Sequence, residues 1–325
     1  MTELLNLKDV KKYFGLRGVP WQKAQAVRAV DGVNLVVNKG ETVGLVGESG
    51  SGKSTLARVA TRLLDPTAGR VEIGGKDVTR IKGRRLRPIR RQIQMVFQDP
   101  QASLNPRQSV GTILSTPFRA QGIRPSRAQL VELLEQVGLS EQHLERYPHE
   151  FSGGQRQRIG IARALSMKPD LLVCDEPVSA LDVSVQAQVL NLLADLRDEL
   201  GLSYVLVAHD LAVVRQVADR IAVMYLGTIV EEGPAAQVYQ SPAHPYTKAL
   251  LSAVPVPEPG VVRDRIVLTG DVPTPIDPPS GCPFRTRCYK AEDVCATERP
   301  VLESVDGEHR AACYFPEPPT SERTE

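Results

Sequence analysis

The sequence has little that would connect the protein to a membrane interior, to a polyanion or to an oxidising compartment. Among its 325 residues no run of 18 or more is apolar, so no segment is expected to span a bilayer. The net charge is only +2, so no nucleic acid partner is expected from charge balance. The N-terminal residues lack the basic, apolar and small-residue pattern of a secretory signal. We therefore expect the protein to stay in the cytoplasm, where thiols remain reduced.

Cysteine is scarce, and its distribution is uneven. Of five cysteines, Cys174 lies in the middle of the chain, whereas Cys282, Cys288, Cys295 and Cys313 lie near its end. The four show no C-x2-C pair, the usual zinc-ribbon spacing. A [4Fe–4S] cluster requires four converging thiolates and accepts irregular spacing. The spacing leaves three alternatives open: such a cluster, zinc or another metal, or free or disulfide-bonded thiols.

The clearest motif is a glycine-rich loop. Residues Gly47 to Ser54 match G-x-x-x-x-G-K-[ST] in full, after an apolar stretch typical of a buried strand and before a segment with helical periodicity. Backbone N–H groups in such a loop surround phosphate oxygens, Lys53 reaches the β- and γ-phosphates, and the Ser54 hydroxyl binds Mg²⁺. The predicted phosphate-binding residues are Gly47, Glu48, Ser49, Gly50, Ser51, Gly52, Lys53, Ser54 and Thr55.

Two adjacent carboxylates follow another apolar stretch, PDLLVCDEP. Ligands gather at the carboxyl ends of strands in α/β sheets, so Asp175 is predicted to bind Mg²⁺, directly or through water. Glu176 points differently and is predicted to polarise the attacking water. Cys174, inside the strand, is interpreted as a small core residue.

A second phosphate-binding device occurs in FSGGQRQRIGIARAL. Ser152, Gly153 and Gly154 open an apparent helix whose N-terminus could hold a phosphate, with Gln155 close behind. It lies about a hundred residues after the first device, and two such devices in one chain would be redundant. The second phosphate-binding device has a role of its own if it closes over the nucleotide of a partner chain.

With these motifs the sequence resembles the ATP-binding subunits of ABC transporters. Gln98, in QMVFQDP, matches the Q-loop glutamine of that family; SALD, residues Ser179 to Asp182, resembles its D-loop; and His209, in VLVAHD, matches its switch histidine. KKYFG resembles the aromatic loop that stacks on adenine, with Phe14 as the better match and Tyr13 as the second choice.

The resemblance implies a mechanism for two ATPase chains that close head to tail over two ATP molecules. Phe14 would stack on adenine, while Ser54, Gln98 and Asp175 would organise Mg²⁺. Glu176 would orient water, and His209 would help to position the γ-phosphate. Ser152, Gly153, Gly154 and Gln155 would reach the ATP of the partner.

Longer stretches, including FQDPQASLNPR and DEPVSALDVSVQAQVLNLL, resemble the dipeptide and oligopeptide importer branch, and most of all its second, F-type ATPase. This implies uptake of di- or oligopeptides by a protein on the cytoplasmic side of the cell membrane. The implied partners are a second related ATPase, two membrane-spanning permease subunits and, indirectly, a substrate-binding protein. Nickel or glutathione cargo stays open. Some members of the branch carry a [4Fe–4S] cluster in this C-terminal tail. A non-transport ABC ATPase would carry a long coiled-coil insertion, which is not seen.

The predicted fold is α/β: a RecA-like P-loop ABC ATPase core over residues 1–98 and 153–255, a helical signature subdomain over 99–152, and a small cysteine-containing C-terminal appendage over 256–325. Residues Arg220 to Gly233 are predicted to form a hairpin that turns at Gly227. The segment Arg80 to Arg91 has seven basic residues and no acid. Contact with nucleic acid or anionic lipid headgroups is one interpretation, and a solvated surface segment is the favoured one.

Overall fold

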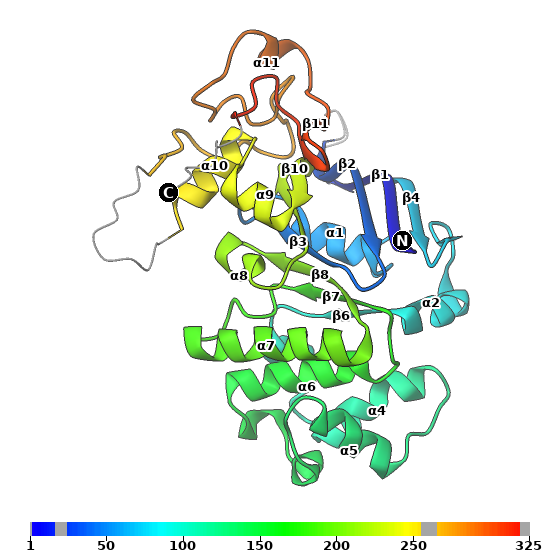
Figure 1. Ribbon diagram of the computed structural model, residues 1–325. Helices are drawn as coiled ribbons and strands as arrows, with labels where there is room; N and C mark the ends of the chain where they lie inside the picture. Colours follow the sequence, from blue (N-terminus) through cyan, green and yellow to red (C-terminus); the bar gives the residue numbers. More distant parts are fainter. Residues whose placement is uncertain (1, 17–24, 255–264, 319–325) are drawn as a thin grey trace.

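The computed structural model describes residues 2–16, 25–254 and 265–318, and these form two β-sheets with helices packed between and beside them (Figure 1). The predicted boundary near residue 255 lies outside the described residues. None of the helices in these ranges is long and apolar enough to cross a membrane.

The larger sheet has eight strands in the order β11-β12-β10-β9-β3-β8-β7-β6. Its centre is parallel and fully buried, as expected for near-continuous apolar runs such as TVGLV and SYVLVA. The predicted hairpin is confirmed, since β9 and β10 pair antiparallel across Leu226 and Gly227. The strands are β3 (Thr42–Val46), β6 (Ile93–Val96), β7 (Leu171–Asp175), β8 (Ser203–Ala208), β9 (Arg220–Tyr225), β10 (Thr228–Pro234), β11 (Glu303–Asp306) and β12 (His309–Ala311).

The smaller sheet is antiparallel, in the order β2-β1-β4-β5. Helix α1 (Lys53–Ala60) lies between the two sheets and buries Leu56 and Val59 against both. This position holds the start of α1, and therefore the glycine loop before it, rigidly at the carboxyl end of the central strand β3. The strands are β1 (Glu3–Gly15), β2 (Ala26–Asn38), β4 (Ala68–Ile73) and β5 (Lys76–Asp77).

Residues 99 to 165 are mainly helical and form the lower part of the molecule in Figure 1. Side chains cap several of these helices: Ser126 and Gln129 form a capping box on α5, and Ser152 and Gln155 form another on α6. The helices here are α3 (Pro100–Ser103), α4 (Val110–Ala120), α5 (Arg127–Glu135) and α6 (Gly153–Leu165), with 3-10 turns at Glu141–Glu145 and Pro148–Glu150. Those that follow are α7 (Val183–Leu200), α8 (Leu211–Arg215), α9 (Ala235–Gln240), α10 (Pro245–Ser252) and α11 (Val294–Thr297).

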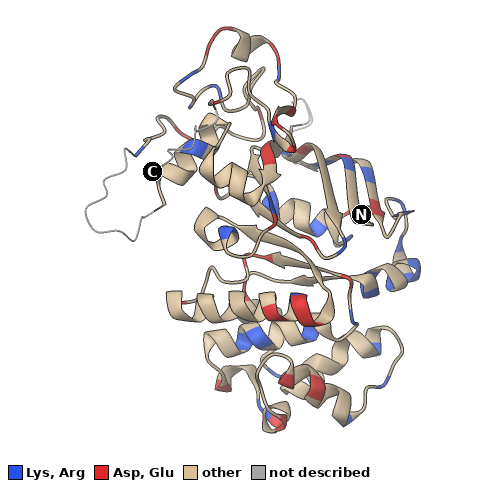
Figure 2. Ribbon diagram, viewed as in Figure 1, with Lys and Arg blue, Asp and Glu red and all other residues tan. Residues whose placement is uncertain are grey.

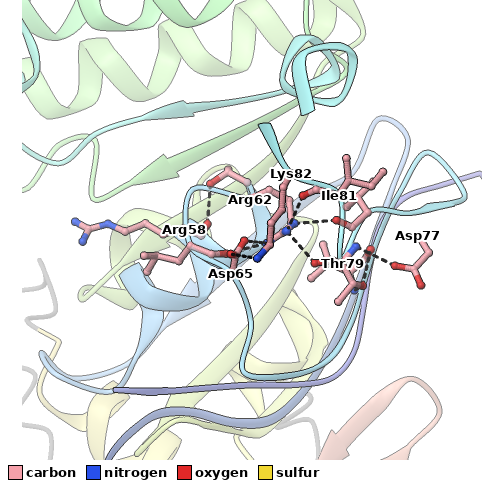
Figure 3. Close-up of polar contacts among 11 residues, drawn as sticks. Arg58, Arg62, Asp65, Asp77, Thr79, Ile81 and Lys82 are labelled. Carbon is pink, nitrogen blue, oxygen red and sulfur yellow. Dashed lines mark hydrogen bonds and ion pairs between the residues drawn. The ribbon is translucent and has the colours of Figure 1, made fainter. Parts of the chain in front are cut away.

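The basic segment, Arg80 to Arg91, forms an exposed ridge, and a buried side chain, that of Arg62, holds the chain that leads into it. The fully buried Arg62 side chain donates to the carbonyls of Val78, Thr79 and Ile81 and pairs with Asp65, which fixes the chain entering the segment (Figure 3). All seven basic residues from Arg80 to Arg91 are exposed, as a solvated surface segment requires, and they gather around α2 (Arg87–Gln92) and the preceding 3-10 turn (Gly83–Leu86) (Figure 2). A cleft of about 1000 Å³ lies along this ridge, and it contains none of the predicted nucleotide-binding residues.

The C-terminal region (residues 265–318) is more integrated than the predicted appendage. Strand β12 pairs with β10, so the hairpin of β11 and β12 extends the core sheet. Phe284 is 1% exposed and packs its ring against those of Tyr225, Tyr246 and His244. The few apolar residues of this region therefore complete the core of the ATPase domain and do not build a separate core.

Candidate nucleotide-binding site

The glycine loop joins β3 to α1, in the strand-loop-helix order that its sequence predicts. Its glycines are required by close backbone neighbours. At Gly47, where φ is 150°, an added Cβ would lie 2.2 Å from the Met224 carbonyl oxygen. At Gly52, where φ is 105°, it would lie 2.0 Å from the Ala29 carbonyl oxygen. The loop is thus pressed between β2 and the hairpin of β9 and β10, which leaves little freedom for its amides to turn away.

Lys53 begins α1 and is 4% exposed. Its Nζ donates to the carbonyl oxygens of Gly47, at 2.7 Å, and Glu48, at 2.8 Å. Burial lowers the pKa of Lys53, and the charges of Glu176 and Asp175 oppose that effect. The ammonium group is therefore held at the centre of the loop, close to two carboxylates.

The side chains of Ser54 and Asp175 lie next to each other, in an arrangement suited to a divalent cation. The Ser54 hydroxyl donates to Asp175 Oδ1 at 2.8 Å, across 121 residues of sequence. Asp175 is 1% exposed at the end of β7, and burial raises its pKa, against the hydrogen bond from Ser54 that lowers it. A hydroxyl and a carboxylate on rigid elements form a donor set that Mg²⁺ accepts, with phosphates and water completing the shell.

Glu176 occupies a left-handed backbone conformation, with φ of 45°, that non-glycine residues seldom adopt. Its N–H donates to the Val207 carbonyl oxygen at 3.0 Å, which stabilises the turn. Its Oε2 accepts a hydrogen bond from Gln98 Nε2 at 2.9 Å and lies 3.5 Å from His209 Nδ1. The three predicted catalytic side chains therefore converge, and strained backbone of this kind is typical of functional sites.

The predicted adenine-stacking pair lies at the end of β1. Phe14 is 39% exposed, with the Lys12 ammonium 5.1 Å from its ring centroid. The Tyr13 hydroxyl instead donates to Asp31, and burial followed by this hydrogen bond raises the pKa of Tyr13 to about 12. Phe14 is thus the one of the two whose ring is available to a ligand.

The signature residues do not join this site within one chain. Ser152 caps α6, accepts from the Gln155 N–H and is exposed, while Gly154 packs so closely on α7 that a Cβ would lie 2.4 Å from Val185 Cγ1. Helix α6 lies in the lower helical part of Figure 1, well apart from α1. Among the described residues no hydrogen bond or ion pair connects Ser152 or Gln155 to the glycine loop.

The C-terminal cysteines lie within electrostatic reach of one another. Burial and then the charges of Cys295 and Cys288 raise the pKa of Cys282, and burial and then Cys282 and Cys288 raise the pKa of Cys313 to about 11. The Cys282 N–H donates to the Cys295 carbonyl oxygen at 2.8 Å, and all are free thiols. In the described ranges, no group of three or more His, Cys, Asp or Glu residues is placed to hold a metal ion.

Four residues that the sequence analysis does not single out also border the site. The Tyr246 hydroxyl accepts from the Glu48 N–H at 2.8 Å, and Arg287 pairs with the Glu48 carboxylate. Arg299 pairs with Asp31, the acceptor of the Tyr13 hydroxyl. No local pattern marks the contacts of Tyr246, Arg287 and Arg299, because their partners lie 198 to 268 residues away in the sequence.

Comparisons with known proteins agree with this geometry. A family described as ABC transporter matches residues 30–179, and one described as Oligopeptide/dipeptide transporter, C-terminal region, matches residues 230–295. The oligopeptide transport ATP-binding protein AppF of Bacillus subtilis is 50% identical over 319 residues, 96% of this chain and 97% of that protein. OppF of Salmonella typhimurium, another oligopeptide transport ATP-binding protein, is 51% identical over 324 residues, 97% of each chain.

Solved structures show the same fold. One is the dimeric structure of a post-hydrolysis state of the ATP-binding cassette MJ0796, bound to ADP and Pi. It superposes with a TM-score of 0.63 at 31% identity, and the match covers 71% of this chain and 99% of the MJ0796 chain. CbiO1 of Clostridium perfringens, part of an ABC transporter complex, gives 0.62 at 26% identity, covering 74% of this chain and 91% of its own. The predicted α/β ABC ATPase fold is confirmed, and the chain belongs to the ATP-binding subunits of ABC transporters, in the oligopeptide and dipeptide importer family.

Proposed function

We propose that this chain hydrolyses ATP at a head-to-tail ATPase dimer to drive the import of di- or oligopeptides. The observation that carries the proposal is the incomplete site: Lys53, Ser54, Asp175 and Glu176 lie together, whereas helix α6, which carries the signature, lies apart from α1 in the same chain (Figure 1). A second chain would supply it. The relatives named for oligopeptide transport support peptide cargo, and nickel or glutathione remains the alternative.

The proposed roles follow the geometry. Phe14 stacks on adenine, and Lys53 and the loop amides from Gly47 to Thr55 hold phosphates, except the Glu48 amide, which donates to Tyr246. Ser54, Asp175 and Gln98 would hold Mg²⁺, which would stabilise the charge of the phosphates. Glu176 takes the proton of the attacking water, and His209 orients the γ-phosphate. The signature residues Ser152, Gly153, Gly154 and Gln155 contact the nucleotide of the partner. Water attack in line with the leaving phosphate needs chiefly positioning and charge stabilisation, which these groups provide.

The proposed assembly contains a second related ATPase and two membrane-spanning permease subunits, with a substrate-binding protein as an indirect partner. The chain would be a peripheral subunit on the cytoplasmic face, and no nucleic acid partner is proposed. Residues 1–98 and 153–255 form the proposed nucleotide-binding core, and the helical region 99–152 is proposed to receive the permease. Residues 256–325 form the C-terminal region of the importer branch.

The test is transport in proteoliposomes that contain the assembled complex. Glu176→Gln is expected to keep ATP affinity and to lower hydrolysis and peptide uptake by a factor of 10² or more, since it removes the general base but little volume. Lys53→Ala is expected to weaken ATP binding itself. Wild-type hydrolysis by Glu176→Gln would refute the general-base role. Uptake of Ni²⁺ or glutathione, with no uptake of tripeptides joined only by α-peptide bonds, would refute the peptide cargo.

We propose further that Cys282, Cys288, Cys295 and Cys313 bind a [4Fe–4S] cluster. The burial of Cys282 and Cys295, the Cys282 N–H donated to the Cys295 carbonyl oxygen at 2.8 Å and the Lys290 N–H donated to Cys288 Sγ at 3.4 Å support this. A zinc ion needs sulfurs at about 2.3 Å from one centre, whereas a four-iron cluster accepts a wider set of thiolates. Protein purified without oxygen should contain about four irons per chain and be brown. Zinc in place of iron, or neither metal, would reject the cluster.

A further inference from the structure

Glu48, the second residue of the phosphate-binding loop, is fixed at three separate groups. Its N–H donates to the Tyr246 hydroxyl at 2.8 Å, and its carbonyl oxygen accepts from Lys53 Nζ at 2.8 Å. Its carboxylate accepts two bonds from Arg287, Nη1 to Oε2 at 2.7 Å and Nη2 to Oε1 at 3.2 Å. The Glu48 carbonyl oxygen also accepts from the Ser51 N–H at 3.2 Å, so its contacts are internal to the loop, whereas those of the N–H and the carboxylate come from α10 and from the C-terminal region.

Arg287 is itself held firmly. It is 9% exposed, and it follows Phe284, which is almost completely enclosed by the rings of Tyr225, Tyr246 and His244. A guanidinium group fixed in this way meets a carboxylate with two parallel bonds, the geometry that gives such pairs their strength and direction. The pair therefore connects the C-terminal region directly to the loop.

We propose that Arg287 is a positioning residue that prepares the glycine loop to bind the phosphates of ATP. This rests on the proposed function, in which the loop binds ATP. Arg287 acts in two ways: it fixes the Glu48 backbone, and it neutralises a carboxylate at the place where the anionic phosphates arrive. A loop already in its binding shape loses less entropy when the ligand binds, and a paired carboxylate repels the ligand less.

A second contact of the same region lies on the adenine side. Arg299 Nη1 donates to Asp31 Oδ2 at 3.0 Å, and the Tyr13 hydroxyl donates to the other oxygen of Asp31. Tyr13 precedes Phe14 in β1, and the Arg28 N–H donates to the Pro275 carbonyl oxygen at 2.9 Å. The C-terminal region thus contacts the phosphate loop directly and reaches the adenine-stacking segment through Asp31.

The experiment measures ATP affinity and steady-state hydrolysis in the assembled transporter. In Arg287→Met, Kd and KM for ATP should each rise about tenfold, while kcat should stay within about twofold, because the loss affects binding and not the reacting groups. Arg287→Lys should be intermediate, since it keeps the charge but loses the two-pronged geometry. Adding Glu48→Gln to Arg287→Met should lower Kd again, because the unpaired carboxylate is removed.

Arg310→Met is the matched control. Arg310 also joins the C-terminal region to the core through an ion pair, with Glu232 on β10, away from the predicted nucleotide-binding residues. This variant should keep the wild-type Kd. Three results would each overturn the proposal. The first is an unchanged Kd for ATP in Arg287→Met, and the second is an equal rise of Kd in Arg310→Met and Arg287→Met. The third is a Kd that does not fall when Glu48→Gln is added to Arg287→Met. If Arg287→Met does not fold, Arg287→Lys decides, and a wild-type Kd there overturns it. A wild-type complex that binds no ATP would refute the proposed function instead.

Discussion

His244, in the loop before α10, is a histidine kept neutral by its surroundings. It is 1% exposed and packs on Phe284, and its Nδ1 accepts a hydrogen bond from the Tyr246 N–H. Burial lowers its pKa from 6.5 to about 4, and the nearby Glu231 carboxylate opposes the shift only in part. Since Glu231 also accepts from the N–H groups of Ala243 and His244, the loop and the sheet are held together here.

The sign of the pH dependence follows. Between pH 6.5 and pH 4 the unfolded chain binds a proton at His244 that the folded chain does not. The stabilisation is therefore complete above pH 6.5 and is lost as the pH falls toward 4, by on the order of 3 kcal/mol in total. Urea unfolding at pH 7.5 and pH 5 should show this loss. His244→Asn, whose side-chain oxygen can still accept at the helix start, should show a smaller difference. Parallel pH profiles for the two proteins would contradict the assignment.

At the scale of single residues, the sequence predicts chemistry well where the motif is local. Gly47 to Ser54 and the pair Asp175 and Glu176 are contiguous, and their positions follow from one strand and the turn after it. Gln98 was identified through the resemblance to the family and not from a local pattern, and its bond to Glu176, across 78 residues, appears only in the structure. The pair of Arg287 with Glu48 spans 239 residues, has no motif, and could come only from the folded structure.

Among the elements, β3 and α8 are packed so tightly that a single methyl group decides the fit. A Cβ added at Gly44 would lie 2.0 Å from Val214 Cγ1. Gly44→Ala is therefore expected to lower the free energy of unfolding by about 1–3 kcal/mol. Adding Val214→Ala should recover part of the loss, because it removes the clashing methyl groups. Chemical denaturation of both variants measures this, and a double variant less stable than Gly44→Ala would contradict the packing.

Helix α6 gives the opposite expectation. Gly160 lies in the helix, and a Cβ there meets no atom within 4 Å. Gly160→Ala should raise the free energy of unfolding by about 0.5–1 kcal/mol, since alanine loses less backbone entropy in a helix. Chemical denaturation, under the conditions used for Gly44→Ala, measures the free energy of unfolding. A lower value for Gly160→Ala than for the wild type would show that a Cβ at this position clashes with a neighbour.

The elements also show where pattern-based prediction stops. The hairpin at Gly227 and the helix starting at Ser152 were predictable because turn and capping residues mark them locally. Strands β11 and β12 were not, because they are short and follow proline-rich sequence. Their place in the core sheet depends on pairing with β10, about 80 residues earlier, which periodicity cannot reveal.

For the whole molecule, the C-terminal region is part of the ATPase fold. Ending the chain at Val254 would uncover the rings of Tyr225 and Tyr246 and the edge of β10. We expect this truncated protein to aggregate, because an unpaired edge strand beside apolar surface associates with other copies. Ending the chain at Pro318 keeps every described contact and serves as the control. Sedimentation after expression distinguishes them, and an equally dispersed, ATP-binding Val254 truncation would disprove the structural role.

The pairing of Glu48 with Arg287 and of Asp31 with Arg299 also has a consequence for biogenesis. On the ribosome, both acidic partners emerge long before the arginines, which are 239 and 268 residues further along. The Glu48 carboxylate therefore stays unpaired, and β10 lacks its pairing with β12, until those later residues have been made. A prematurely released chain would carry every ATPase motif in its sequence and still lack the final supports of its nucleotide site. Chains released before Arg287 is made should therefore bind ATP less tightly than chains that extend past it, although both carry the same motifs.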